Sequence, residues 1–461
     1  MRKTFDIAGD LDTPVSAFMK LGAFRPRFLL ESVEGGERLG RYSFIGFGDS
    51  LEYRLESDAL YVDGVRTPAP ADRDALLASL RAALARAARP QPEIAHVPLA
   101  GGLVGYAAYD VVRYFERLPE HAQPVAGTPL MHYVAPRSML VFDHLTRGIA
   151  VLHAGSAGER ESLRREIVRA LRGGLPNGQA RGRHSEPVPS LTREAYIEGV
   201  RRAKEAITAG DVYQLVLSAR FSGRHDLDPF QVYRALRLIN PSPYLYYSRL
   251  GEHTVVGSSP EALVKLSAGV AELRPIAGTR PRDDDPQRDA ANEAALRADP
   301  KENAEHVMLV DLARNDLGRV ASAGSVRVEP YRSIERYSHV MHMVSGVHGT
   351  LAPGRDAFDL FAAAFPAGTL VGAPKVRAMQ LIDELEPVRR GLYGGTIGYF
   401  GAQGDMDQAI TIRTLVFNGD EYSFQAGAGI VADSDPDAEY DEVRAKGAAL
   451  VRALALAEEG L

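Results

Sequence analysis

The alternation of apolar and polar residues predicts a mixture of helices and strands in the second half of the chain. Residues 192–210, TREAYIEGVRRAKEAITAG, place apolar side chains at helical spacing, with Thr192 as the N-cap and Gly210 at the end. The runs QLVLSARF (214–221), HTVVGSS (253–259) and AELRPIAGT (271–279) are typical of strands. Periodicity alone therefore indicates a mixed α/β structure.

The first part of the chain shows the same mixture. Strand-like runs at 51–65 and 138–153 surround an Ala/Leu/Arg helix near 74–88. Residues 174–191, GLPNGQARGRHSEPVPSL, are rich in Gly, Pro and polar residues and predict a linker or an exposed crossover. We therefore expect an N-terminal region over 1–173 and a second region over 192–461.

One turn in the second region has the composition of an anion-binding loop. Residues 365–379, FPAGTLVGAPKVRAM, combine four helix breakers with a cation, Lys375, that begins a helical pattern. Glycines let backbone N–H groups approach a ligand, and the start of a helix favours an anion. The alternative is a structural loop that only caps a helix.

Composition limits the classes of function. The chain has 461 residues, of which 45% are hydrophobic and 25% charged, and a net charge of -6, which argues against a nucleic-acid-binding surface. It has no cysteine, which excludes disulfides, thiolate metal sites and a cysteine nucleophile. The N-terminal residues lack the apolar core of a signal peptide, and no apolar run approaches the ~20 residues of a membrane span, so we expect a cytoplasmic protein.

Two pairs of glutamates are spaced for metal binding. Glu302 and Glu305, and likewise Glu439 and Glu442, lie three residues apart in helical patterns, so each pair shares one helix face. Carboxylates without cysteine or a clear histidine cluster suit Mg²⁺. The ordinary alternative is a solvated helix face.

A glycine motif near the C-terminus matches a nucleotide-binding pattern but lacks its context. Residues 427–432, GAGIVA, fit G-x-G-x-x-A after a strand-like run. DSDPD follows where the crossover helix should begin, and too few residues remain for another βαβ unit. A dinucleotide cofactor is therefore not expected.

Several long motifs in one order carry a family resemblance. They are PIAGTRPR (275–282), KENAEHVMLVDLARNDLGRV (301–320), HVMHMVS (339–345), YGGTIGYF (393–400) and AGAGIVADSDPDAEYDEVRAKG (426–447). Together they resemble the chorismate-utilizing enzymes. Two further segments, LLESVEGGERLGRYSFIG (29–46) and NPSPYLYY (240–247), resemble the tryptophan-sensing segments of the anthranilate synthase component I branch. The resemblance implies an α+β fold in which large antiparallel sheets pack face to face, with helices outside and the active site between the sheets.

The resemblance also implies roles for individual residues. Glu261 would protonate the leaving ring hydroxyl of chorismate, with His342 and Thr369 beside it. Glu305 and Glu442 would be direct Mg²⁺ ligands, supported by Glu302 and Glu439. Substrate contacts would come from Thr279, Lys375, Tyr393, Arg413, Gly427, Ala428, Gly429 and Lys446. A feedback pocket for L-tryptophan would include Glu31, Ser32, Pro243 and Tyr244.

The implied reaction converts chorismate and ammonia into anthranilate and pyruvate, the first committed step of tryptophan biosynthesis. Ala277 stands where water-using and para-aminobenzoate-forming relatives carry a lysine, which favours the anthranilate outcome. Because the chain lacks cysteine, it would use free ammonia or ammonia from a separate glutamine amidotransferase subunit, and the resemblance implies the second source, in a hetero-oligomer. The alternatives are an aminodeoxychorismate synthase, a phenazine-type aminodeoxyisochorismate synthase, and a non-enzymatic tryptophan-sensing or docking subunit.

Overall fold

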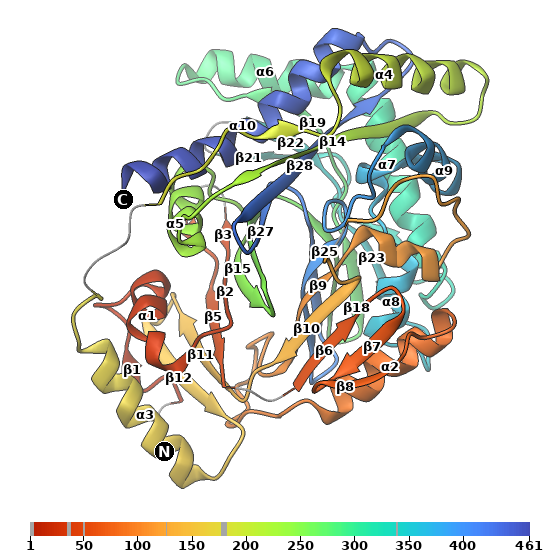
Figure 1. The fold of residues 1–461 in the computed structure, drawn as a ribbon. Coiled ribbons are helices and arrows are strands. Elements are labelled where there is room, and N and C mark those ends of the chain that lie inside the picture. Colours follow the sequence, from red (N-terminus) through yellow and green to blue (C-terminus); the bar gives the residue numbers. More distant parts are fainter. Residues whose placement is uncertain (1–3, 35–37, 49–50, 126, 177–181, 338–339) are drawn as a thin grey trace.

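Two large antiparallel sheets face each other in the computed structural model, with helices on their outer sides (Figure 1). The structure describes residues 4–34, 38–48, 51–125, 127–176, 182–337 and 340–461. This architecture confirms the fold class that the family resemblance implies. Within the described residues, no helix is long and apolar enough to cross a membrane.

The first sheet has 12 strands. In spatial order they are β1 (Ile7–Ala8), β12 (Gly148–His153), β11 (Ser138–Asp143), β5 (Tyr42–Phe47), β2 (Phe28–Glu31), β15 (Tyr244–Leu250), β16 (His253–Ser259), β27 (Thr414–Asn418), β28 (Glu421–Ile430), β14 (Gln214–Arg224) and β13 (Val188–Pro189), with β24 (Gly372–Ala373) paired to β14.

The second sheet has 11 strands. Their order is β20 (Arg327–Val328), β23 (Val347–Thr350), β18 (Val270–Leu273), β17 (Ala262–Ser267), β26 (Met406–Ile410), β25 (Thr396–Gly401), β9 (Gly102–Ala107), β10 (Met131–Ala135), β6 (Leu51–Leu55), β7 (Ala59–Val62) and β8 (Val65–Pro68). A small sheet joins β19 (Ile276–Pro281), β22 (Val340–Val344) and β21 (Ser333–Arg336), and β3 (Val33–Glu34) pairs with β4 (Arg38–Leu39).

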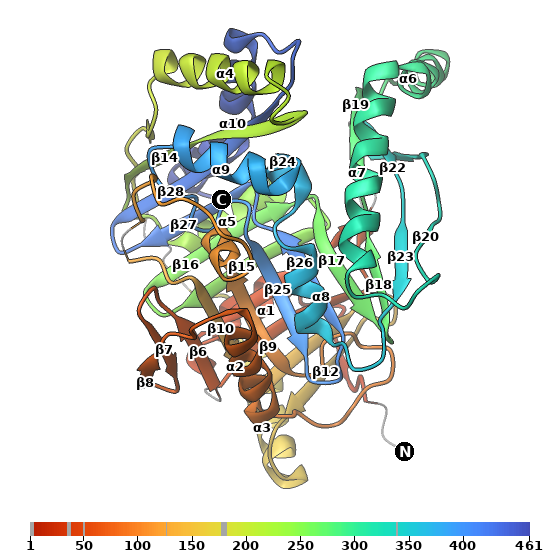
Figure 2. The ribbon, with the colours of Figure 1, turned by 90° about the vertical axis from the view of Figure 1, so that its right-hand side faces the viewer.

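The helices cover the outer faces of the sheets (Figures 1 and 2). Helices α4, α5 and α10 contact the first sheet at β14, β16 and β28, whereas α2 and α8 contact the second. The helices are α1 (Pro14–Lys20), α2 (Arg73–Arg86), α3 (Ala157–Leu171), α4 (Arg193–Thr208), α5 (Pro229–Ile239), α6 (Pro286–Ala298), α7 (Pro300–Gly318), α8 (Ala357–Ala364), α9 (Lys375–Leu385) and α10 (Pro436–Glu459), with short 3₁₀ turns at η1 (Gly22–Phe24), η2 (Tyr109–Tyr114) and η3 (Gly368–Leu370).

Local sequence signals predict several of these elements correctly. Helix α4 starts after Thr192, whose side chain accepts a hydrogen bond from the backbone N–H of Ala195, and it ends at Thr208, two residues before Gly210. The run at 271–279 is different, because it contains two strands, β18 and β19, that belong to different sheets. Pro275 separates them, since proline cannot donate a ladder hydrogen bond.

Each large sheet contains strands from both sides of the predicted linker. In the first sheet β2 pairs with β15, and in the second β9 pairs with β25. A cluster of buried side chains between the sheets includes Phe28, Phe44, Tyr106, Tyr246 and Tyr399 from both layers. The two parts of the chain therefore share one core. Part of the predicted linker, residues 177–181, lies outside the described residues.

The backbones of neighbouring strands lie so close at Gly105 that a side chain there would clash. A Cβ atom built on this residue would lie 2.0 Å from the carbonyl oxygen of His132 on β10. We expect Gly105→Ala to lower the free energy of unfolding by about 3 kcal/mol, because the strands must separate. Urea denaturation measures this change. As a control, Gly22→Ala at the start of η1 meets no atom within 4 Å and does not occupy a left-handed conformation, so a loss no larger than the control's would contradict the close approach.

Candidate active site

Glu261 and Arg413, which are expected to act on the substrate, lie where the chain passes from one large sheet to the other. Glu261 follows β16 of the first sheet and precedes β17 of the second. Arg413 lies between β26 of the second sheet and β27 of the first, in a left-handed conformation with φ of 49°. The N–H of Ser258 donates to the carbonyl of Arg413 at 3.2 Å. The two crossings are therefore adjacent.

Glu261 has the properties of an acid that works near neutral pH. Burial raises its pKa to about 7, while a hydrogen bond from Thr369 and the charge of Arg413 act in the opposite direction. The Thr369 hydroxyl donates to Oε1 of Glu261 at 3.0 Å. A carboxyl with this pKa is partly protonated at neutral pH and can donate a proton to a leaving hydroxyl. The structure thus brings together two of the three residues expected to be catalytic.

The third residue, His342, lies on the small sheet opposite Thr279. Its Nδ1 atom forms hydrogen bonds with the Thr279 hydroxyl at 3.0 Å and with the Gly278 carbonyl at 3.3 Å. The edge of the Tyr337 ring meets the imidazole, with ring centroids 5.5 Å apart. Burial lowers the pKa of His342, and Arg413 lowers it further. The imidazole is therefore neutral at physiological pH and fixed in orientation.

Lys446 and Tyr393 converge on the glycine strand β28. The Lys446 ammonium donates to the Gly427 carbonyl at 3.0 Å and pairs with Glu442 at 2.7 Å. A Cβ atom on Gly427 would lie 2.7 Å from the Tyr393 hydroxyl, so only glycine fits there. Arg413 forms no ion pair with any carboxylate in the described part of the chain, which leaves its guanidinium free for a ligand.

The other two strand residues expected to bind substrate differ in what they present. The side chain of Ala428 is buried in the core, so it offers only backbone groups. Gly429 lies beneath the Gln214 amide, whose nitrogen would be 2.6 Å from an added Cβ. The same amide is 3.5 Å from Oε1 of Glu305. Gln214, which sequence reasoning did not single out, thus connects β28 to helix α7.

The four glutamates lie on two helices whose charges interact (Figure 2 shows α7 and α10). Glu302 pairs with Arg280 at 3.2 Å. Burial raises the pKa of Glu305, and Glu302 and Glu442 raise it further. Burial also raises the pKa of Glu439, with a contribution from Glu442. The carboxylates of α7 and α10 therefore face one another closely enough to repel.

This donor set suits a hard cation. Within the described residues, no group of three or more His, Cys, Asp or Glu side chains is gathered as a metal site. The mutual repulsion of Glu305 and Glu442 is the kind that a divalent cation relieves, and carboxylate oxygens are the ligands that Mg²⁺ prefers. The residues present therefore fit a magnesium ion.

Lys375 points inward in this structure. Its ammonium forms an ion pair with the buried Asp316 of α7 at 2.6 Å and lies 3.4 Å from the carbonyl of Ala364. The loop ahead of it, residues 365–374, which we call the cradle, continues directly into α9, as the sequence pattern predicts. The fixed contribution of Lys375 is thus to anchor this segment to α7.

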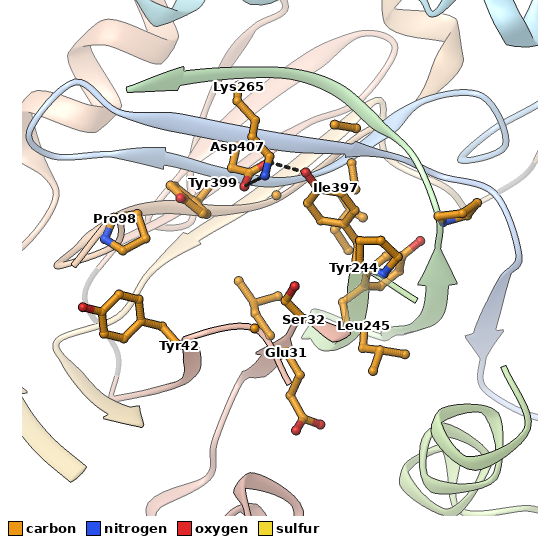
Figure 3. A pocket seen from close by; sticks show the side chains of 18 of the residues that line it. Glu31, Ser32, Tyr42, Pro98, Tyr244, Leu245, Lys265, Ile397, Tyr399 and Asp407 are labelled. Carbon is orange, nitrogen blue, oxygen red and sulfur yellow. Dashed lines mark hydrogen bonds and ion pairs between the residues drawn. The ribbon is translucent and has the colours of Figure 1, made fainter. Parts of the chain in front are cut away.

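A cavity of about 460 Å³ between the two sheets contains every residue of the expected feedback pocket (Figure 3). Glu31 and Ser32 enter it at the end of β2, and Pro243 and Tyr244 enter it at the start of β15. Tyr399 and Ile397 of β25 form part of the opposite wall. The pocket therefore depends on strands that are far apart in the sequence.

Glu31 does not direct its carboxylate into this cavity. The Glu31 carboxylate turns away from the cavity toward α5, where it accepts hydrogen bonds from Tyr233 and from Arg237 at 3.1 Å (Figure 3). Asp407 of β26 lines the cavity and accepts a hydrogen bond from the Tyr244 hydroxyl at 2.9 Å. Sequence reasoning missed Asp407. Its signal was an acidic side chain within a strand whose other inward positions are apolar.

The small sheet connects the cavity to the site. Ile276 of β19, Glu335 of β21 and the adjacent Tyr337 line the cavity. Thr279 and His342 lie on the same sheet, and Tyr337 contacts His342. The wall of the cavity and the sheet that bears His342 therefore meet at Tyr337.

Comparison with known proteins identifies the family of this chain. The family model for chorismate binding enzymes matches residues 25–452. The chain is 47% identical to anthranilate synthase component 1 of Thermus thermophilus, covering 100% of this chain and 98% of that one. It is 44% identical to anthranilate synthase component 1 of Pseudomonas aeruginosa, covering 99% and 96% of the two chains.

The chain belongs to the chorismate-binding enzyme family, in its anthranilate synthase component 1 group.

Solved structures of family members share the fold of this chorismate-binding enzyme. Anthranilate synthase component I from Streptococcus pneumoniae superimposes with a TM-score of 0.80 at 35% identity, covering 96% of this chain and 98% of that one. The menaquinone-specific isochorismate synthase of Escherichia coli gives a TM-score of 0.70 at 20% identity, covering 96% and 91% of the chains, which indicates a shared fold alone.

The raised pKa of Glu261 makes the stability of this chorismate-binding enzyme depend on pH. The pKa is about 7 in the folded chain against an ordinary value of 4.5, so between these pH values the folded state holds a proton that the unfolded state has lost. We expect stability to fall as pH rises through this window, and Glu261→Gln to remove that contribution. Urea unfolding at pH 5 and pH 8 measures the difference between the two proteins.

Equal pH dependence in the wild-type and Glu261→Gln proteins would contradict this assignment. Thr369→Val is a useful companion, because loss of the hydrogen bond that lowers the pKa of Glu261 should extend the decline to higher pH.

Proposed function

We propose that this chain converts chorismate and ammonia into anthranilate and pyruvate, in the first committed step of L-tryptophan biosynthesis. The observation that carries the proposal is identity of 47% to a curated anthranilate synthase component 1 over the whole chain. The local sequence supports the amination, since Ala277 on β19 offers no amine or base that would activate water.

The side chains divide the chemistry between them. Glu261, protonated and oriented by Thr369, donates a proton to the leaving hydroxyl of the ring. His342 stays neutral and is held by Thr279 beside the same region. Arg413 offers a planar fork of donors for a carboxylate, and Tyr393 closes the space above Gly427.

We assign Mg²⁺ binding to Glu305 and Glu442, with Glu302 and Glu439 in support. The ion supplies electrostatic polarisation of a substrate carboxylate when it is bound. Lys446 already bridges Glu442 and the Gly427 carbonyl, so it lies where a second substrate carboxylate would need a cation. Lys375 contributes by fixing the cradle, through its ion pair with Asp316.

A separate glutamine amidotransferase subunit, anthranilate synthase component II, supplies the ammonia in this proposal. The support is chemical: the chain has no cysteine, and the common glutaminases need a cysteine nucleophile. The working enzyme would be a hetero-oligomer located in the cytoplasm.

We propose L-tryptophan as the ligand of the cavity between the sheets. Its volume of about 460 Å³ suits an amino acid with an indole ring, and tyrosine rings line its walls. Asp407, which already contacts Tyr244 at 2.9 Å and Lys265 at 3.4 Å, and the Ser32 hydroxyl would contact the ammonium group, whereas Glu31 braces β2 against α5. Pressure on Tyr337 and His342 through the small sheet would couple this pocket to catalysis.

The central test is direct. We expect the purified chain, given chorismate, Mg²⁺ and ammonium salt at alkaline pH, to form anthranilate, which is measured by its fluorescence. Chelation of the metal with EDTA should stop the reaction. Consumption of chorismate without anthranilate would instead indicate a sibling enzyme, and mass spectrometry of the product would identify it.

The metal ligands are tested in the same assay. Glu442→Gln should cost at least about 100-fold in turnover at saturating chorismate and raise the Mg²⁺ concentration needed for half-maximal rate, because a direct ligand is lost. Glu458→Gln, at the far end of the same helix, is the matched control. Undiminished Mg²⁺-dependent activity of Glu442→Gln would remove Glu442 from the site.

Inhibition by L-tryptophan tests the pocket. Tyr244→Ala removes a ring of the wall and the hydroxyl partner of Asp407, so we expect at least a tenfold rise in the tryptophan concentration that halves the rate (about 1.4 kcal/mol). Leu245→Met, a volume-conserving change in the same wall, should leave this concentration within about threefold. Each variant is compared with its own uninhibited rate. A wild-type chain unaffected by saturating tryptophan would refute the proposal.

A further inference from the structure

A buried arginine that no sequence motif singled out lies behind the active site. Arg390 is 2% exposed and follows helix α9 by five residues. Its Nε and Nη2 atoms donate to the two carboxylate oxygens of Glu386, at 2.9 and 2.7 Å. A buried guanidinium is costly unless its donors are satisfied, so its other contacts decide what it does.

The remaining donors of Arg390 join the cradle to the first sheet. Nη1 donates to the Leu370 carbonyl at 2.6 Å, and Nη2 also donates to the Val216 carbonyl of β14 at 2.8 Å. Leu370 ends the turn η3, so its carbonyl lacks a helical partner there. The residue before it is Thr369, whose hydroxyl binds Glu261. One guanidinium thus fixes the backbone beside the catalytic threonine.

Two aromatic rings enclose the same guanidinium. Its central carbon lies 5.0 Å from the ring centroid of Tyr109 and 5.5 Å from that of Tyr393. The N–H of Tyr393 also bonds the carbonyl of Arg390 at 3.2 Å. Cation–π attraction of this kind strengthens when the cation is desolvated. Arg390 therefore fixes both the ring and the backbone of a residue expected to contact substrate.

Glu386 extends the network to the strand that bears Gly427. Its Oε1 atom accepts hydrogen bonds from the Ser218 backbone at 2.9 Å and from the Ser218 hydroxyl at 2.7 Å. The Gln425 amide donates to the same hydroxyl at 2.8 Å. Ser218 is paired with Gly427 across β14 and β28. Thr369, Tyr393 and Gly427 are consequently joined through one buried ion pair.

We propose that Arg390, held by Glu386, is a positioning residue that aligns Thr369 and Tyr393 with Glu261 for catalysis. The role rests on the proposed function, since it concerns the same reaction. In this proposal Arg390 and Glu386 act through other residues and do not touch the reacting atoms. Lysine cannot replace the arginine, because an ammonium is a single point donor and cannot reach Glu386, Leu370 and Val216 together.

The experiment compares Arg390→Lys with Arg113→Lys. Arg113 forms another half-buried pair anchored on α9, with Asp383 at 2.6 Å, and also donates to the Pro119 carbonyl at 2.6 Å, but not to the cradle. Both variants should lose thermal stability. We expect only Arg390→Lys to lose turnover, by about tenfold to a hundredfold, because misplaced catalytic groups carry penalties of that order.

The pH profile separates positioning from a general loss of structure. Thr369 lowers the pKa of Glu261, so a displaced Thr369 should move the alkaline limb of the kcat profile to higher pH. The rates are measured at constant free ammonia, by adjusting the ammonium salt at each pH. Arg390→Lys should show this shift, whereas Arg113→Lys should keep the alkaline limb of the wild-type protein.

If Arg390→Lys does not fold, Ser218→Ala is the alternative variant for testing the proposal. It removes one donor to Glu386 and should cause a smaller loss of turnover with a limb shift in the same direction. The proposal would be overturned if Arg390→Lys kept the turnover and the alkaline limb of the wild-type protein. If only Ser218→Ala folds, the same result in that variant would overturn it. A wild-type chain that forms no anthranilate refutes the proposed function instead, so the two failures are distinct.

Discussion

The passage of the chain between two facing sheets is the constraint on which the site depends. At Glu261 and at Arg413 the backbone leaves one large sheet and enters the other, and the antiparallel pairing of β16 with β27 keeps the two crossings together. A side chain at such a crossing is enclosed by both layers. The raised pKa of the Glu261 carboxyl is thus a result of topology, because desolvation by the surrounding protein is its main cause.

The ion pairs around the site differ in how deeply they are buried. The Lys446–Glu442 pair is about half exposed, and the same ammonium lies beside the strand expected to hold substrate. By contrast, Asp316–Lys375 and Glu386–Arg390 are inward pairs whose partners are fixed, and they set the position of the cradle. The site therefore combines one exposed ion pair with two buried ones.

Local patterns predicted what local physics determines. The Thr192 cap, the helical spacing of the glutamates on α7 and α10, and the turn before α9 all follow from neighbouring residues. Family motifs added the fold and the pairing of Glu261 with Thr369. The orientation of the Glu31 carboxylate toward Arg237, the ion pair of Lys375 and the exposure of Asp407 to the cavity depend on partners more than 50 residues away, which periodicity does not encode.

The interleaving of early and late strands has a consequence for synthesis on the ribosome. Strands β2 and β9 belong to the first quarter of the chain, yet their partners β15 and β25 emerge much later. Until then both strands present unpaired edges, which invite association with other chains. Neither large sheet can close before β25, β26, β27 and β28 have been made. Folding of the nascent chain is therefore completed after translation rather than region by region during it, and the emerging polypeptide needs protection in the interval.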